Sequence, residues 1–131
     1  MTASYYPSLD PLDSTPICIT REPNVGGTSL QGIINVSYGE LLDAFGPPDH
    51  CSDVPYEDGG GKVNCEWNLR IDSEIVTIYD WKEDKKYTKV TEWHIGGHDK
   101  HAHAKAKEAL KSYRAWKQGG EPRILQNPVQ S

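Results

Sequence analysis

Three segments between residues 63 and 95 have strand patterns, the first with a regular alternation of apolar and polar residues, and this series constrains the fold most strongly. The segments are residues 63–71, 74–81 and 87–95. Asp72 and Ser73 leave room only for a tight turn between the first two, and a charged turn, 82–86, precedes the third. Strands joined by such short turns pair antiparallel, so the sequence predicts a meander with one solvated face.

A short helix is predicted before the meander. The Ser37 hydroxyl can cap the first free amides, and Glu40 follows three residues later as in a capping box. Gly46 and the two prolines after it end the segment, because proline cannot continue a helical turn. Before this helix, residues 28–36 carry β-branched residues and are expected to form a strand or an extended approach to the helix.

A longer helix is predicted after the meander. Gly96 and Gly97 interrupt the third strand pattern, Asp99 can cap a helix, and residues 100–117 are rich in strong helix formers. Its apolar face is mainly alanine, with larger side chains near its end. The residues that share this face are Ala102, Ala106, Ala109, Leu110, Tyr113 and Trp116.

The fold that these patterns predict is α+β: a short helix, a three- to four-stranded antiparallel meander, and a C-terminal helix packed on one face of the sheet. At 131 residues the chain has the size of one domain. We assign that domain to residues 28–118. Residues 1–27, rich in proline and glycine, are expected to form an extended arm with at most one short strand, and residues 119–131 a polar tail.

The tryptophans of the strand patterns allow two interpretations. With one Phe and one Met in the chain, aromatic side chains must supply much of the core. Trp67, Trp81 and Trp93 occur once in each strand pattern, so they either stack in the core or line an exposed aromatic face.

The three cysteines, Cys18, Cys51 and Cys65, are an odd number without a C-x-x-C spacing. This favours reduced thiols in a cytoplasm, with a Cys51–Cys65 bridge as the alternative. No apolar run approaches the roughly eighteen residues of a membrane span, so no membrane association is expected.

The charge distribution favours a protein partner. The net charge is −5, and much of the positive charge lies in the C-terminal helix, so the rest of the chain is strongly acidic. A loop at residues 48–62 concentrates acidic side chains, among them Glu57 and Asp58. An acidic body argues against nucleic acid as a ligand and suits a partner with a basic patch, and a homo-oligomer is a further option.

Four of the five histidines lie between residues 94 and 103, and imidazole is a common ligand for zinc and copper. Strand and helix periods point His101 and His103 well apart, so the pattern favours solvated histidines over a metal site. The remaining metal candidates are His94, His98 and His101. No cofactor motif is present, and we expect no cofactor.

Catalysis is the weaker hypothesis. Asp80 with Glu66 or with Glu92 could form an acid–base pair, but nothing in the sequence determines the register between their strands. No nucleophile motif or phosphate loop accompanies them. We therefore expect a binding surface, and its candidate residues are Arg70, Tyr79, Asp80, Trp81, Trp93 and His94, with Glu57 and Asp58 in the acidic loop.

A set of short motifs resembles a family of small uncharacterised proteins encoded by bacteriophages and large DNA viruses. The motifs are at residues 29–32, 38–47, 66–67, 77–82 and 92–97. The order of helix, Phe-Gly-x-Pro, loop and Trp strand also resembles the repeat of β-lactamase-inhibitor-protein and outer-membrane assembly lipoprotein folds. The first resemblance implies a viral origin without an activity, and the second implies an α+β architecture.

The resulting hypothesis is a non-enzymatic viral accessory protein that binds a host or viral protein, for example a host defence component, and inhibits or redirects it. One alternative is a sponge for a small nucleotide-like ligand, with Trp81, Trp93, His94 and Arg70 around a pocket. Two others are a metal-dependent hydrolase built on His94, His98 and Asp99, and a virion structural subunit. The expected location is the host cytoplasm, or the virion for the last alternative.

Overall fold

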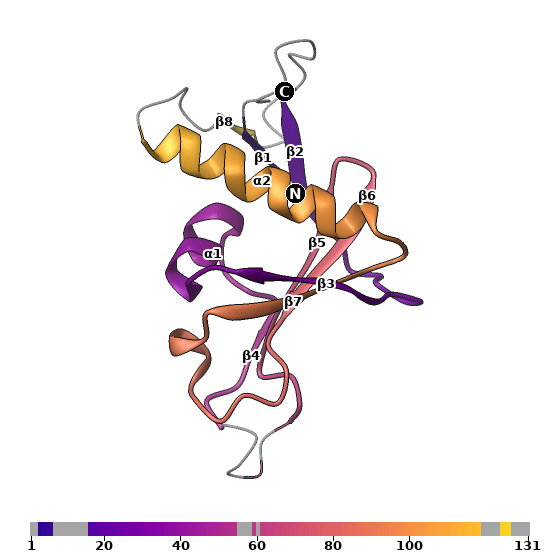
Figure 1. Ribbon diagram of the computed structural model, residues 1–131. Helices are drawn as coiled ribbons and strands as arrows, with labels where there is room; N and C mark the ends of the chain where they lie inside the picture. Colours follow the sequence, from indigo (N-terminus) through magenta and orange to yellow (C-terminus); the bar gives the residue numbers. More distant parts are fainter. Residues whose placement is uncertain (1–2, 7–15, 55–58, 60, 119–123, 127–131) are drawn as a thin grey trace.

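The α+β fold is confirmed by the computed structural model, which describes residues 3–6, 16–54, 59, 61–118 and 124–126 (Figure 1). Its described part contains two α-helices, a single 3₁₀ turn and one antiparallel sheet. In chain order the elements are β1 (Ala3–Tyr6), β2 (Ile17–Arg21), β3 (Ser29–Asn35), α1 (Tyr38–Phe45), β4 (His50–Cys51), β5 (Cys65–Ile71), β6 (Glu74–Tyr79), η2 (Tyr87–Lys89), β7 (Glu92–Gly97), α2 (His101–Lys117) and β8 (Ile124–Gln126).

The predicted meander forms the centre of the sheet. β5 pairs with β6 and β6 with β7, both antiparallel, and every second residue of β5 is buried. β3 pairs with β7 as the fourth strand, and the sheet is larger than the three or four strands expected because β2 pairs with β5 and β1 pairs with β2. Across the described residues the strand order is β3-β7-β6-β5-β2-β1-β8, with β4 pairing separately with β5.

The N-terminal arm differs from the prediction. Residues 1–27 contribute two strands instead of at most one, and Tyr6, Ile17 and Ile19 are buried in the core. The Tyr6 hydroxyl also donates a hydrogen bond to the carbonyl oxygen of Ala44. A strand as short as β2 is stabilised by its pairing with β5, and that distant partner leaves no local pattern in the sequence. Within the expected tail, β8 pairs with β1.

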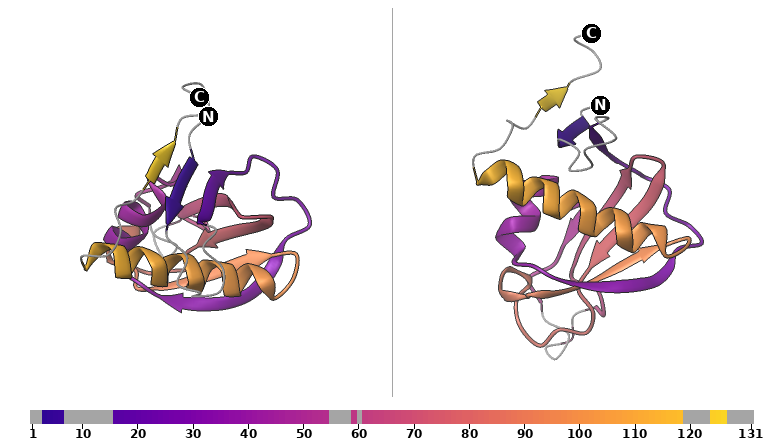
Figure 2. Two further views of the ribbon diagram at one scale, coloured as in Figure 1. Left: turned by 90° about the horizontal axis from the view of Figure 1, so that it is seen from above. Right: turned by 45° about the horizontal axis from the view of Figure 1, so that its top comes forward.

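The expected cap forms at α1, whereas the residue at the N-cap position of α2 is Lys100, whose side chain makes no capping hydrogen bond. Ser37 Oγ accepts a hydrogen bond from the Glu40 amide at 3.1 Å, and Asp99 Oδ1 accepts one from the His101 amide at 2.9 Å. Gly46 ends α1 with a φ of 79°, a left-handed conformation that suits glycine. Helix α2 lies across one face of the sheet, and α1 lies on the same side next to it (Figure 2).

The core interpretation is confirmed for two of the three strand tryptophans. Trp67 and Trp93 are completely buried and meet edge to face, with 5.5 Å between ring centroids. Trp67 donates its indole N–H to the carbonyl oxygen of Gly46, which joins the strand to the end of α1. Trp81 is different, because 42% of its surface is exposed.

Gly97 allows α2 to approach the sheet closely. A Cβ atom at Gly97 would lie 2.1 Å from the Ala102 Cβ and 3.1 Å from the Ile75 carbonyl oxygen. We expect Gly97→Ala to lower the free energy of unfolding by about 1–3 kcal/mol, because the helix and strand must move apart. Urea unfolding followed by circular dichroism measures this difference.

The control for that substitution is Gly39→Ala in α1. A Cβ at Gly39 would meet its nearest neighbour, Ser37 Oγ, only at 3.9 Å. Alanine favours helix over glycine, so this variant should gain up to about 1 kcal/mol. Equal stability of Gly97→Ala and the unmodified chain would contradict the close contact of Gly97 with Ala102.

Candidate binding face

The face of the sheet opposite the two helices is not covered by any helix among the described residues. We name it the open face. Because strand side chains alternate between faces, the register determines its members. In the four strands β3, β7, β6 and β5 they are Leu30, Ile33 and Asn35, Glu92, His94 and Gly96, Ile75, Thr77 and Tyr79, and Glu66, Asn68 and Arg70, with Trp81 following β6.

An aromatic cluster lies at one part of this face. The register places Tyr79 opposite His94, and their rings stack with centroids 5.6 Å apart and an angle of 21°. Trp81 contacts Tyr79 edge on, at 6.4 Å between centroids. Strand alternation explains the position of Trp81, since it lies two residues after Tyr79 and so on the same side. The structure therefore brings together three of the predicted binding residues.

A shallow pocket of about 240 Å³ adjoins this cluster. Glu66, Thr77, Tyr79 and Trp81 contribute to its lining, and Gly96 leaves room beside them. Burial raises the pKa of the Glu66 carboxyl, and burial together with the nearby Glu66 charge raises the pKa of the Tyr79 hydroxyl. The pocket is smaller than the roughly 300–1,000 Å³ typical of sites that enclose a small molecule.

Asp80 does not belong to the open face, which corrects its assignment as a binding residue. It is completely buried, and its Oδ1 accepts hydrogen bonds from the amides of Asn64 at 2.7 Å and Cys65 at 3.0 Å. Alternation places its side chain on the opposite side of the sheet from Glu66 and Glu92, so neither acid–base pair forms. Asp80 holds the chain at the start of β5.

Trp93 and Arg70 also differ from their expected roles. Trp93 is completely buried and donates its indole N–H to the Val90 carbonyl oxygen, so it offers no surface to a partner. Arg70 lies on the open face but is held by Glu22, with 2.8 Å between Nη2 and Oε1. The Asn24 amide and Arg70 lower the pKa of that carboxyl. Glu57 and Asp58 lie outside the described residues.

The histidines diverge in space. His98 Nε2 lies 3.0 Å from the Gly26 carbonyl oxygen, His103 Nε2 lies 3.1 Å from that of Ile33, and His94 stacks on Tyr79. The proposed metal ligands are therefore not brought together. Within the described ranges, the group with metal-ligand spacing is Glu74, Asp99 and His101, whose ligand atoms lie within 4.8 Å of one another. Asp99 and His101 are exposed and already pair with each other at 3.0 Å.

Two cysteines meet across a strand pair. β4 places Cys51 opposite Cys65, and their sulfur atoms lie 3.0 Å apart as free thiols. Burial, with a smaller contribution from Cys51, raises the pKa of the Cys65 thiol. The strand register explains why these two cysteines are close. The sequence had left a Cys51–Cys65 bridge open as the alternative to reduced thiols.

The sequence patterns missed the contribution of β3 to the open face. Leu30 and Ile33 are both exposed there, but a shift of register between Leu30 and Gly32 breaks their alternation. An irregularity of this kind hides a two-residue period. The β-branched and apolar residues of this segment indicated a strand in the sequence. Only its pairing with β7 shows which of its side chains face outward.

Comparisons with protein-family models, with curated proteins and with solved structures found no match to this chain. The resemblance to a viral family therefore stays a prediction. In the described part of the chain, no helix combines the length and apolar character needed to cross a membrane.

Proposed function

We propose that this protein is a non-enzymatic accessory protein that binds another protein through its open face. Following the resemblance to viral proteins, its partner is a host or viral protein, such as a component of host defence, which the binding inhibits or redirects. The open face provides the contact area, and its aromatic cluster provides the anchor.

The observation that carries this proposal is the exposure of large apolar side chains on the open face. Leu30 is 56% exposed, Ile33 43% and Trp81 42%, and the first two lie on the same strand. Exposed apolar patches on otherwise polar proteins commonly mark interaction sites. Tryptophan is among the residues most often found at energetic centres of interfaces, so Trp81 is the expected anchor.

The small-ligand alternative has one supporting feature, the shallow pocket beside Trp81. Its volume of about 240 Å³ and its single wall of aromatic side chains suit a contact with part of a partner better than enclosure of a nucleotide-like molecule. Of the residues suggested for such a sponge, only Trp81 lines this pocket. The hydrolase alternative has no support from His94 and His98, which point to different partners.

The test compares Trp81→Ala with Leu42→Ala as bait in lysate of the host cells, followed by measurement of the affinity for the captured partner. Leu42 is a matched control, because it is 39% exposed on α1 and lies away from the open face. We expect the unmodified chain and Leu42→Ala to bind equally, and Trp81→Ala to bind at least about tenfold more weakly.

Three results would refute the proposal. The first is a partner that binds Trp81→Ala as tightly as the unmodified chain. The second is the absence of a specific partner together with a retained small molecule in native mass spectrometry. The third is incorporation into purified virus particles as a stoichiometric component, which would favour the structural-subunit alternative.

A further inference from the structure

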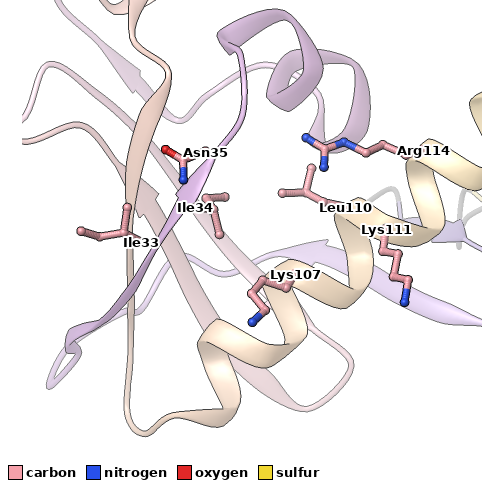
Figure 3. Close-up of a pocket in the computed structure, with 7 residues that line it drawn as sticks. All are labelled: Ile33, Ile34, Asn35, Lys107, Leu110, Lys111 and Arg114. Carbon is pink, nitrogen blue, oxygen red and sulfur yellow. The ribbon is translucent and has the colours of Figure 1, made fainter.

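A second surface lies at the edge of the sheet, between β3 and α2. β3 ends the strand order, and no described strand pairs with its outer edge. A groove of about 450 Å³ separates this edge from α2. Figure 3 shows Ile34 and Leu110 pointing toward each other from the two elements. Both side chains are buried, so they form an apolar floor.

Backbone groups are available along this edge. Directly after β3, the Val36 amide donates a hydrogen bond to the carbonyl oxygen of Thr91, which directly precedes β7. Backbone groups of every second residue point the same way, so those of Ile34 also face β7. Those of Ile33 and Asn35 therefore point toward the groove. His103 Nε2 contacts the Ile33 carbonyl oxygen, whereas no described residue hydrogen-bonds to the Ile33 amide or to the backbone of Asn35.

The α2 side of the groove is basic. Lys107, Lys111 and Arg114 line it at helical spacings of four and three residues. Glu40 neutralises Arg114, with 2.9 Å between Oε2 and Nε. Lys107 and Lys111 are exposed and form no ion pair with any described residue. The one acidic residue of β3 and β7 is Glu92, opposite Asn35, and alternation directs its side chain to the open face.

These charges favour an acidic occupant. A second copy of the chain, paired through its own β3 edge, would bring a second set of unpaired lysines to the same groove, and like charges repel. An acidic segment would instead meet Lys107 and Lys111 in a chain whose overall charge is −5.

We propose that the groove binds an extended acidic peptide segment of a partner protein, which pairs with β3 as an additional strand. Backbone hydrogen bonds to Ile33 and Asn35 hold the strand, in the manner of β-strand addition at a sheet edge. Every second side chain of the added strand faces α2, so acidic residues at alternate positions reach Lys107 and Lys111. This surface is separate from the aromatic cluster and does not depend on it.

The experiment uses the full chain and a fluorescent seven-residue peptide with blocked ends, in which Glu alternates with Val or Thr. Fluorescence anisotropy measures its affinity. We expect the double variant Lys107→Glu/Lys111→Glu to weaken binding at least about tenfold, because two attractions become repulsions. Trp81→Ala and the matched exposed change Lys89→Glu on η2 should leave the affinity unchanged. A peptide with Lys in place of Glu should not bind.

A second measurement separates strand pairing from charge attraction. Two N-methylated peptides are compared, one modified at its odd-numbered residues and one at its even-numbered residues. Each modification removes the amide protons on one side of the added strand. The peptide that loses the protons facing β3 should not bind, and the other should bind. Hydrogen exchange at the Ile33 and Asn35 amides should slow at least about tenfold in the complex. The proposal is overturned by no binding, by equal binding of both N-methylated peptides, or by a dimer that forms through this edge and excludes the peptide.

Discussion

Replacing Trp93 by alanine should lower the free energy of unfolding by about 3–5 kcal/mol, the usual cost of removing a large aromatic side chain from a core. Trp93 is completely buried, packs edge to face on Trp67 and donates a hydrogen bond to Val90. Its removal leaves a cavity between the sheet and the helices. Urea unfolding followed by far-UV circular dichroism gives the difference without relying on tryptophan fluorescence.

Trp81→Ala is the matched control for that experiment. The same change of residue on the open face removes an exposed side chain, so the free energy of unfolding should stay within about 0.5 kcal/mol of the unmodified chain. Similar losses for both variants would show that Trp81 belongs to the core, and its proposed role as an anchor for a partner would have to be abandoned.

Replacing Asp80 by alanine should cost about 2–5 kcal/mol, because two buried amides lose their acceptor and each unsatisfied group costs about 1–3 kcal/mol. These are the amides of Asn64 and Cys65, both bonded to Oδ1. The loss should appear as a lower denaturation midpoint with an unchanged slope, since the same surface is exposed on unfolding.

Two further variants test this explanation for Asp80. Asparagine can present a carbonyl oxygen at the position of Oδ1. The loss in free energy of unfolding should therefore be less than half as large for Asp80→Asn as for Asp80→Ala. Asp84→Ala, at an exposed position in the turn after β6, should change the free energy of unfolding by less than about 0.5 kcal/mol. If Asp80→Ala is as stable as the unmodified chain, the carboxylate is not the anchor of β5.

The open face and the β3–α2 groove meet at one strand. Ile33 contributes its side chain to the open face, while its backbone points into the groove. The two surfaces can be tested independently, because Trp81 follows β6 and lies on the open face, whereas Lys107 and Lys111 lie on α2, on the other side of the sheet.

Local sequence was sufficient for the helices and for the first two central strands, whereas the third begins at Glu92 instead of Tyr87, after a 3₁₀ turn, and continues through Gly96 and Gly97. The Ser37 cap of α1, the hydrogen bond from the His101 amide to Asp99 just before α2, the glycine end of α1 and the period of two in β5 each depend on residues close together in the chain. Such signals act through backbone geometry and nearby hydrogen bonds, so they can be read without knowledge of the tertiary fold.

The candidate site was only partly predictable. Tyr79, Trp81 and His94 were identified as binding residues, and the structure places them together. Trp93 and Asp80 were identified by the same reasoning, yet both are buried, because adjacent residues of a strand face opposite sides and the sequence did not determine which side was the core.

The sequence alone thus determined the α+β class, the meander and the positions of both helices. Only the tertiary structure decided that β2 extends the sheet beside β5, that α2 covers one face and leaves Trp81 on the other, and that β3 is an edge beside two unpaired lysines. The physical reason is that these features depend on pairing and packing between residues far apart in the chain. The periodic pattern of a single segment does not show which distant segment it will contact.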